Sequence, residues 1–160
     1  MATDIFLKVD GIDGEATDVN HTGEIEVASW SWGVSQVFIS SLGGGIVGGT
    51  PKVGNILVTK QVDRASPILL RACLELTHIA QAVLTQRRPG AGKQDFLSVT
   101  LQDVLISSLN DVDDGLAPKP KETIVFVFSR VIYEYIPQKP SGLPDTPVML
   151  KWDVQANAEF

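Results

Sequence analysis

The sequence predicts a mainly β protein: a compact two-sheet β-barrel or sandwich with one α-helix at about residues 67–78. Apolar and polar residues alternate along most of the 160-residue chain, and glycine, proline and aspartate repeatedly interrupt the alternation. A single segment has helical spacing instead. A chain of this length predicts one domain over 1–160 and buries roughly 68 to 70% of its unfolded surface.

The N-terminal third predicts short strands separated by turns. Alternation at 4–9 indicates a first strand, and the Asp- and Gly-rich stretch at 10–14 ends it. The pattern resumes at 24–27 with apolar residues at odd positions, but Trp30 and Trp32 fall at even positions. Either the strand is buried on both faces, or a bulge exchanges the faces; we favour the bulge.

A glycine-rich stretch follows an extended segment at 33–39. Residues 40–54 contain six of the 14 glycines of the chain. Glycine has no side chain to pack and the widest backbone freedom, so this stretch is expected to be mobile and without packing of its own.

The helix prediction rests on Ser66 as N-cap, Pro67 in the first turn, and apolar residues at helical spacing up to Leu76. Cys73 lies on the apolar face of this helix, where a small buried side chain is expected. Alternation predicts further strands at 55–63, 81–88, 95–107, 122–136 and 147–154.

Charge and composition exclude several classes of function. The formal net charge is −6, so the basic surface of a nucleic-acid-binding protein is missing. Cys73, His21 and His78 are too few for a structural zinc site, and one cysteine excludes an internal disulfide. The N-terminal residues lack the pattern of a signal peptide, and no apolar run is long enough for a membrane helix. No cofactor or metal is expected.

The search for catalytic motifs predicts no enzyme. The glycines at 43, 45 and 48 match G-x-G-x-x-G, but a strand follows where dinucleotide binding requires a helix. Gly90–Lys93 lacks the remaining residues of a phosphate-binding loop and reads as a hairpin turn. The acidic stretch 111–122 lacks the glycine of an EF-hand. A Ser–His hydrolase would require His21 or His78 beside a serine, and no motif supports one.

Short motifs along nearly the whole chain resemble the Hcp (haemolysin-coregulated protein) family, the inner-tube proteins of the bacterial type VI secretion system. The motifs are Phe6–Glu15, His21 with Gly23–Val27, Ser29–Gly33, Thr59–Lys60, Asp63–Pro67, Leu84–Arg87, Val104–Ser108, Tyr133–Tyr135 with Pro137–Gln138, and Trp152–Asp153. None of them is catalytic, but their order and spacing make the combination specific.

The resemblance implies a partly closed β-barrel with one helix that assembles into six-membered rings. These rings would stack into a hollow tube, leave the cell on sheath contraction, and carry or chaperone effectors in the lumen. The implied partners are further copies of this chain, sheath and spike proteins, and effector proteins, with no nucleic acid and no membrane insertion. Assembly would be cytoplasmic, followed by export without a signal peptide. The chain ends at Phe160 after its last strand, so no attached toxin domain is expected.

Candidate functional residues follow from the alternation and the resemblance. Ser31 faces away from Trp30 and Trp32, so it is a candidate lumen residue that contacts cargo, or else an ordinary exposed serine. The candidates for ring stacking are Gly43, Gly44, Gly45, Ile46, Val47, Gly48 and Gly49. The alternative function is a monomeric carbohydrate- or peptide-binding module, with exposed tryptophans as its ligand surface.

Overall fold

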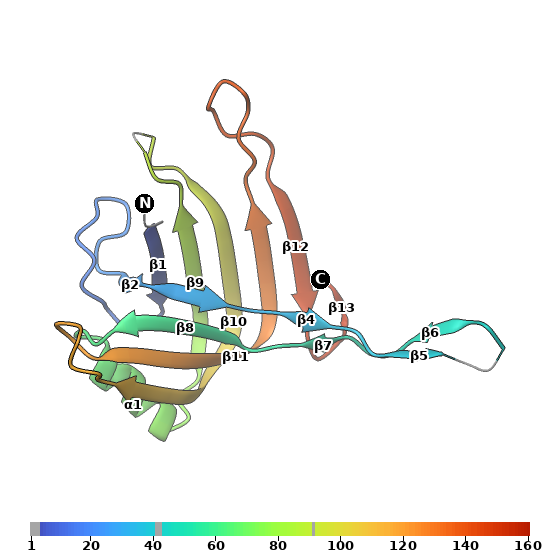
Figure 1. The fold of residues 1–160 in the computed structure, drawn as a ribbon, viewed down its shortest axis with the longest axis horizontal. Coiled ribbons are helices and arrows are strands. Elements are labelled where there is room, and N and C mark those ends of the chain that lie inside the picture. The colour runs from blue at the N-terminus through green and yellow to red at the C-terminus, as the bar shows by residue number, and fades with distance from the viewer. Residues whose placement is uncertain (1–3, 41–42, 91) are drawn as a thin grey trace.

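The fold is given by a computed structural model that describes residues 4–40, 43–90 and 92–160 (Figure 1). Within these residues the elements, in chain order, are β1 (Asp4–Val9), β2 (Ile25–Val27), β3 (Ser29–Ser31), β4 (Val34–Ser35), β5 (Phe38–Ser40), β6 (Ile46–Gly48), β7 (Lys52–Val53), β8 (Ile56–Gln61), α1 (Ser66–Leu74), β9 (Ile79–Arg87), β10 (Asp95–Val112), β11 (Lys121–Tyr135), β12 (Val148–Asp153) and β13 (Ala158–Glu159).

Nine of these strands form one bent antiparallel sheet. Its main order is β13-β12-β11-β10-β9-β1-β2, while β8 pairs with β11 and β3 pairs with β8. The remaining strands form two short pairs, β4 with β7 and β5 with β6. The predicted mainly β class with one helix is confirmed, and the barrel is only partly closed.

The bend arises because β10 and β11 are long enough to belong to two layers. Residues 121–126 of β11 pair with β8, whereas residues 130–135 pair with β12. The same hairpin therefore continues from the upright layer of Figure 1 into the lower one. Asp103 lies in the left-handed region at φ 62°, and the β10–β11 register shifts between Ile106 and Ser108. Such a local kink increases strand bending.

The core lies between the two layers, and α1 packs against β10 at one end. Buried side chains alternate along the strands, as a half-buried sheet requires. The fully buried apolar residues include Leu7, Ile25, Ile56, Val58, Leu69, Leu84, Leu101, Ile106, Ile124 and Phe126. Trp30, Trp32 and Trp152 are partly buried and pack against this core.

The helix starts near its predicted position but ends earlier. It runs over Ser66–Leu74 instead of 67–78, because Leu76 adopts a left-handed φ of 52° and Thr77 N–H donates to the Ala72 carbonyl, 2.9 Å away. This is a common way for a helix to terminate. Ser66 is not the N-cap: that position is Ala65, without a side-chain cap. Cys73 is half-buried against the core.

The exchange of faces around Trp30 has a larger cause than a bulge. β2 pairs with β1 in one layer, and β3 pairs with β8 in the other. The chain crosses between the layers at Ala28, whose N–H donates to the Thr59 carbonyl at 2.8 Å. The predicted exchange is therefore correct, but its origin is a change of partner strand.

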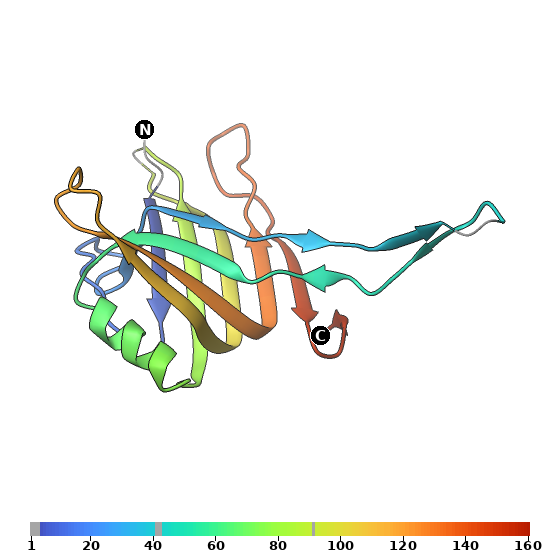
Figure 2. The same ribbon diagram turned by 60° about the horizontal axis from the view of Figure 1, so that its bottom comes forward.

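The glycine-rich stretch is a paired β-ribbon, so the prediction of a stretch without packing of its own is wrong. β4 pairs with β7, and β5 pairs with β6, in one extended two-stranded arm (residues 33–54, below "the ribbon"). Residues 41 and 42, which belong to the stretch predicted to be mobile, lie outside the described residues. Figure 2 shows the ribbon projecting far from the body of the molecule. The apolar segments on either side of the glycines supply the pairing.

Candidate assembly surfaces

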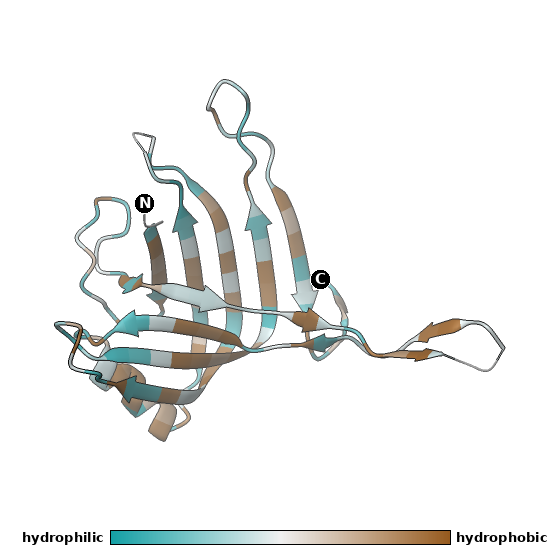
Figure 3. Ribbon diagram, in the orientation of Figure 1, coloured by the Kyte–Doolittle hydropathy of each residue, from teal (hydrophilic) through white to brown (hydrophobic). Residues whose placement is uncertain are grey.

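The ribbon exposes an unusual amount of apolar surface. Phe38 is 68% exposed, Ile39 63% and Ile46 76%, and Val34, Val37 and Val47 are exposed as well. The strands β5 and β6 near the end of the ribbon are correspondingly coloured as hydrophobic in Figure 3. An isolated two-stranded ribbon is only marginally stable in water, and a contiguous apolar surface indicates a contact site. The ribbon is therefore the first candidate assembly surface.

The base of the ribbon is fixed to the body. The indole N–H of Trp32 donates to the Gly54 carbonyl at 2.9 Å, and Gly54 N–H donates to the Gly33 carbonyl at 2.9 Å. A Cβ on Gly54 would come within 2.7 Å of the Gly33 carbonyl oxygen, so the two strands meet closely only because glycine stands there. The Trp32 ring packs against Phe128 and Tyr133. This anchoring sets the direction in which the ribbon leaves the body.

The open edge of the main sheet is the second candidate surface. β12 pairs with β11 on one side, but on its other side β13 covers only Trp152 and Asp153. Val148 is 65% exposed, Met149 49% and Leu150 41%. An exposed apolar edge strand is a ready template for pairing with another chain. Residues of both faces of β12 are thus available to a partner.

The structure places the predicted candidate residues on two elements. Ser31 is exposed at the end of β3, opposite Leu57 of β8, in agreement with the predicted alternation. Gly43, Gly44 and Gly45 lie at the turn of the ribbon, while Ile46, Val47 and Gly48 form β6 and Gly49 bonds back to Val37. The sequence interpretation missed Phe38 and Ile39 on the facing strand, and Val148–Leu150 on β12. Apolar residues on both sides of the glycines are a hairpin signal that would have found the first pair.

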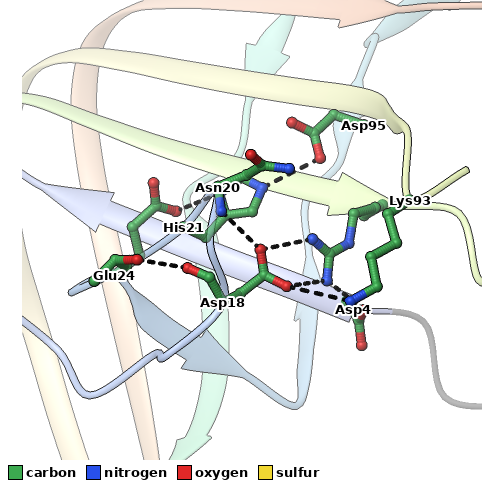
Figure 4. Close-up of polar contacts among 9 residues, drawn as sticks. Asp4, Asp18, Asn20, His21, Glu24, Lys93 and Asp95 are labelled. Atoms are coloured by element: carbon green, nitrogen blue, oxygen red, sulfur yellow. Dashed lines mark hydrogen bonds and ion pairs between the residues drawn. The ribbon is translucent and has the colours of Figure 1, made fainter.

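A polar cluster ties the loop between β1 and β2 to the sheet (Figure 4). His21 is buried, with Nδ1 2.9 Å from Glu24 Oε2 and Nε2 3.2 Å from Asp95 Oδ1. A carboxylate only accepts hydrogen bonds, so the imidazolium form alone donates to both. The Phe6 ring stacks on the imidazole with centroids 4.3 Å apart. These contacts give His21 a structural role in holding the loop against the sheet.

Arg87 completes this cluster. Its guanidinium donates to both carboxylate oxygens of Asp18 at 2.8 Å, and to Asp4 Oδ2 at 2.8 Å. The hydrogen bond from Arg87, together with one from the Asn20 N–H, holds the pKa of Asp18 well below its usual range. The same pairing with Asp18 and Asp4 raises the pKa of Arg87. The loop is therefore fastened to β9 by charge-assisted bonds.

A second polar network lies under α1 and is buried except for the partly buried Asp63. Lys60 Nζ lies 2.8 Å from Glu122 Oε2 and 2.8 Å from Asp63 Oδ1, and it donates to Ser66 Oγ at 3.0 Å. The Ser66 hydroxyl donates to Glu122 Oε2 at 2.5 Å. The side chains of Lys60 and Glu122 are both 0% exposed. These bonds join β8, β11 and the start of α1.

The contacts of His78 do not fit a Ser–His pair. His78 Nε2 lies 2.5 Å from Asp103 Oδ1, and the Ser129 hydroxyl donates to Asp103 Oδ2 at 2.6 Å. The carboxylate stands between the two, so the imidazole is not placed to deprotonate the serine. Among the residues outside the gaps at 1–3, 41–42 and 91, no three His, Cys, Asp or Glu side chains gather as metal ligands. In the same part of the chain, no helix has the length and apolar character needed to cross a membrane.

An apolar projecting ribbon and an open apolar sheet edge place the chain in the class of proteins that act through contacts with other proteins. Comparison with known proteins narrows this class. The family model described as type VI secretion system effector, Hcp, matches residues 6–135. Protein hcp1 of Pseudomonas aeruginosa is 37% identical over 161 aligned residues, which cover 99% of both chains.

Solved structures agree with this match. The crystal structure of Hcp1 from Salmonella typhimurium is 36% identical, covers 100% of both chains, and superposes with a TM-score of 0.81. A type six secretion system protein superposes with a TM-score of 0.93 at 28% identity, covering 99% of this chain and 100% of its own. The chain therefore belongs to the Hcp family, the secreted tube and effector proteins of the type VI secretion system.

Proposed function

We propose that this chain is a structural subunit that closes into hexameric rings, and that these rings stack into the hollow tube exported on sheath contraction. The observation that supports it best is that one subunit carries two different apolar surfaces, the ribbon and the β12 edge. A contact between two different surfaces of identical chains closes into a ring or continues as a filament. A tube of stacked rings needs both: a lateral contact that closes each ring, and an axial contact that continues from ring to ring.

The lateral contact in this proposal uses strand edges. β12 is open on one side of the main sheet, and β2 is the short strand at the other end. Pairing such edges between neighbours removes the exposed backbone donors and acceptors that would otherwise promote aggregation. We assign the ribbon to stacking. It carries Phe38 and Ile39 on one strand, and the residues predicted for stacking, Gly43–Gly49, on the turn and the other strand.

Charge predicts how this assembly responds to salt. Six subunits of net charge −6 would give one ring a net charge of −36. Salt shortens the range of that repulsion, with a Debye length of about 10 Å at 0.1 M. We expect stacking to increase with ionic strength, measured by light scattering at fixed protein concentration. Stacking that is indifferent to salt would contradict the electrostatic part of the proposal.

Within the ring, we assign Ser31 to the lumen, where it contacts effector cargo. Its exposure on β3 and its position beside the half-buried Trp30 and Trp32 support this assignment. Ser31→Gln enlarges the side chain without disturbing the core, so we expect reduced retention of co-expressed effectors with rings intact. Ser107→Gln, at another exposed serine, is the matched control. Unchanged retention with Ser31→Gln would refute the assignment.

The remaining roles follow from the same proposal. The subunit assembles in the cytoplasm with the sheath and spike proteins, and it leaves the cell through the type VI system. It acts as a building block and not as an enzyme, without cofactor, nucleic acid or membrane insertion. Support comes from the family match and from the acidic charge of −6.

The alternative, a monomeric ligand-binding module, required exposed tryptophans. Trp30 and Trp32 are instead half-buried, and their indole N–H groups donate to Gln86 Oε1 and the Gly54 carbonyl. Tryptophan fluorescence separates the two functions: the assembly proposal predicts a blue-shifted spectrum that is poorly quenched by iodide. A red-shifted spectrum that is strongly quenched would favour the binding module.

A further inference from the structure

We propose that an apolar hollow at the base of the ribbon receives Phe38 from the ribbon of a second copy of this chain. The inference rests on the proposed self-assembly and adds to it a specific acceptor site. The hollow lies between the base of the ribbon and β12, and its volume is about 230 Å³. Trp32, Trp152, Val53 and Val131 line it, with Val34 and Leu150 among the lining residues that remain exposed.

The size and chemistry of the hollow suit an aromatic ring. All the side chains that line it are those of Trp, Val, Leu or Pro residues. An apolar protein cavity of about 150 Å³ is large enough for benzene. The hollow therefore has room for the phenyl ring of Phe38, and its exposed lining residues leave a route of entry. A concave apolar surface of this kind gains free energy when another apolar group displaces its water.

Phe38 is the most suitable group on the ribbon to fill it. It is the largest apolar side chain of the described ribbon residues and is 68% exposed. Its cross-strand partner in β5–β6 is Gly48, so no facing side chain covers the ring. Ile39, in contrast, faces Val47. Phe38 thus stands free on one face of the ribbon.

Phe38 does not reach the hollow of its own chain. Val34 of β4 already lines the hollow, and Phe38 lies four residues farther along the extended ribbon, roughly 13 Å at strand spacing. Figure 2 shows the ribbon directed away from the body along this whole length. The donor and acceptor must therefore belong to different copies.

Charge favours a second copy as the occupant. Residues 33–54 contain a single charged residue, Lys52, so the ribbon carries +1 while the remainder of the chain carries −7, which together give −6. Lys52 lies at the base of the ribbon, and residues 34–51 carry no charge, so the ribbon can reach an acidic second copy without the repulsion that two acidic bodies exert on each other. The hollow also contains Leu150 of the open β12 edge, so it continues the apolar surface already assigned to assembly.

The test uses two substitutions that each block one half of the contact. Phe38→Glu places a charge on the inserted side chain, and Leu150→Lys places one at the acceptor. Each is expected to reduce the mass fraction of assemblies larger than one ring by about tenfold or more, as for central contact residues. Sedimentation velocity measures this fraction, and circular dichroism checks the fold.

Complementation is the decisive part. The Phe38→Glu chain retains an intact hollow, and the Leu150→Lys chain retains an intact Phe38. In a single chain that carries both substitutions, every junction is a Glu–Lys pair. This double variant is therefore expected to restore stacking to about threefold or more above either single variant. Phe38→Glu combined with Leu116→Lys in one chain, at an exposed site on the loop after β10, is the matched control. It has the same net charge but leaves Glu against an unaltered hollow, so it should stack no better than Phe38→Glu alone.

Each outcome separates the two claims. A wild-type chain that never exceeds a monomer overturns the proposed function and this inference with it. A wild type that forms single rings but never stacks overturns this inference and the stacking part of the proposed function. Normal stacking by the wild type that is unaffected by Leu150→Lys, or not restored in the double variant beyond the control, overturns only the hollow. If Leu150→Lys disturbs the fold, Val34→Lys, at another exposed residue of the hollow, replaces it in the same experiment.

Discussion

Replacing the buried Lys60 by methionine is expected to cost about 3–5 kcal/mol of unfolding free energy. Methionine keeps an unbranched side chain but removes the ammonium that contacts Glu122, Asp63 and Ser66 at 2.8–3.0 Å. The Glu122 carboxylate is 0% exposed, so it stays buried with a hydroxyl as its remaining partner in this network. The cost of an uncompensated buried charge sets the magnitude.

Urea unfolding followed by tryptophan fluorescence measures this cost, at a protein concentration low enough that assembly does not add stability. For a chain of this size the predicted loss lowers Tm by about 6–20 °C. Lys8→Met, at an exposed position of β1, is the matched control and should change stability by less than about 0.5 kcal/mol.

The double variant Lys60→Met with Glu122→Gln tests the mechanism. It removes the unpaired charge of the fully buried Glu122, and the Asp63 carboxylate keeps its hydrogen bond from the Ala65 N–H, so we expect it to recover most of the loss, as replaced buried ion pairs commonly do. A loss below about 1 kcal/mol for Lys60→Met would refute the reasoning. So would a double variant that is no more stable than Lys60→Met.

Two further predictions concern the loop between β1 and β2. Because the pKa of Asp18 is lower in the folded state, its bond to Arg87 stabilises the protein above about pH 4 and is lost as the pH falls further. Asp18→Asn should therefore show a shallower loss of stability between about pH 4 and pH 2 than wild type in urea unfolding, and parallel curves would contradict this. Gly14→Ala should cost about 2 kcal/mol or more, since a Cβ there would lie 2.4 Å from the Glu24 carbonyl oxygen. Gly33→Ala, with open space around it, should be nearly neutral in the same assay, and equal effects would exclude the steric explanation.

The sequence was sufficient to predict the fold class, because strand alternation and turn residues are local signals. The start of α1 was predictable for the same reason, from Pro67 and the apolar spacing that follows it. Its end was not, since it depends on Leu76 adopting a left-handed conformation that leucine rarely takes. The continuation of β10 to Val112 depends on pairing with β11, a contact between segments separated in the chain.

The two polar networks are built largely from residues of the motifs that suggested the family. The motifs themselves did not show that these residues contact one another. His21, Glu24 and Arg87 belong to motifs that suggested the family, and the structure brings them into one cluster. Lys60 and Ser66 likewise come from separate motifs and meet at Glu122. Sequence alone does not show which polar residues become buried partners. These motifs contribute to the stability of the subunit, and the surfaces assigned to assembly lie elsewhere.

The ribbon was the largest difference between prediction and structure. Its glycines suggested mobility, but Phe38–Ser40 and Ile46–Gly48 pair across them. The conformational freedom of the glycines at the turn therefore gave little information about β5 and β6 on either side of it. The apolar side chains of the arms, and not the glycines, form the exposed surface. This distinction moves the expected contact from the turn to the strands beside it.

The native mass of the purified chain tests the central proposal most directly. Light scattering on a size-exclusion peak, with negative-stain images of the same fraction, should give about 104 kDa for six copies of the 17.3 kDa chain in a closed ring. Ring-shaped particles of this mass, and longer stacks at higher salt, are the predicted result. A 17.3 kDa monomer at all concentrations and salt conditions would contradict the proposal.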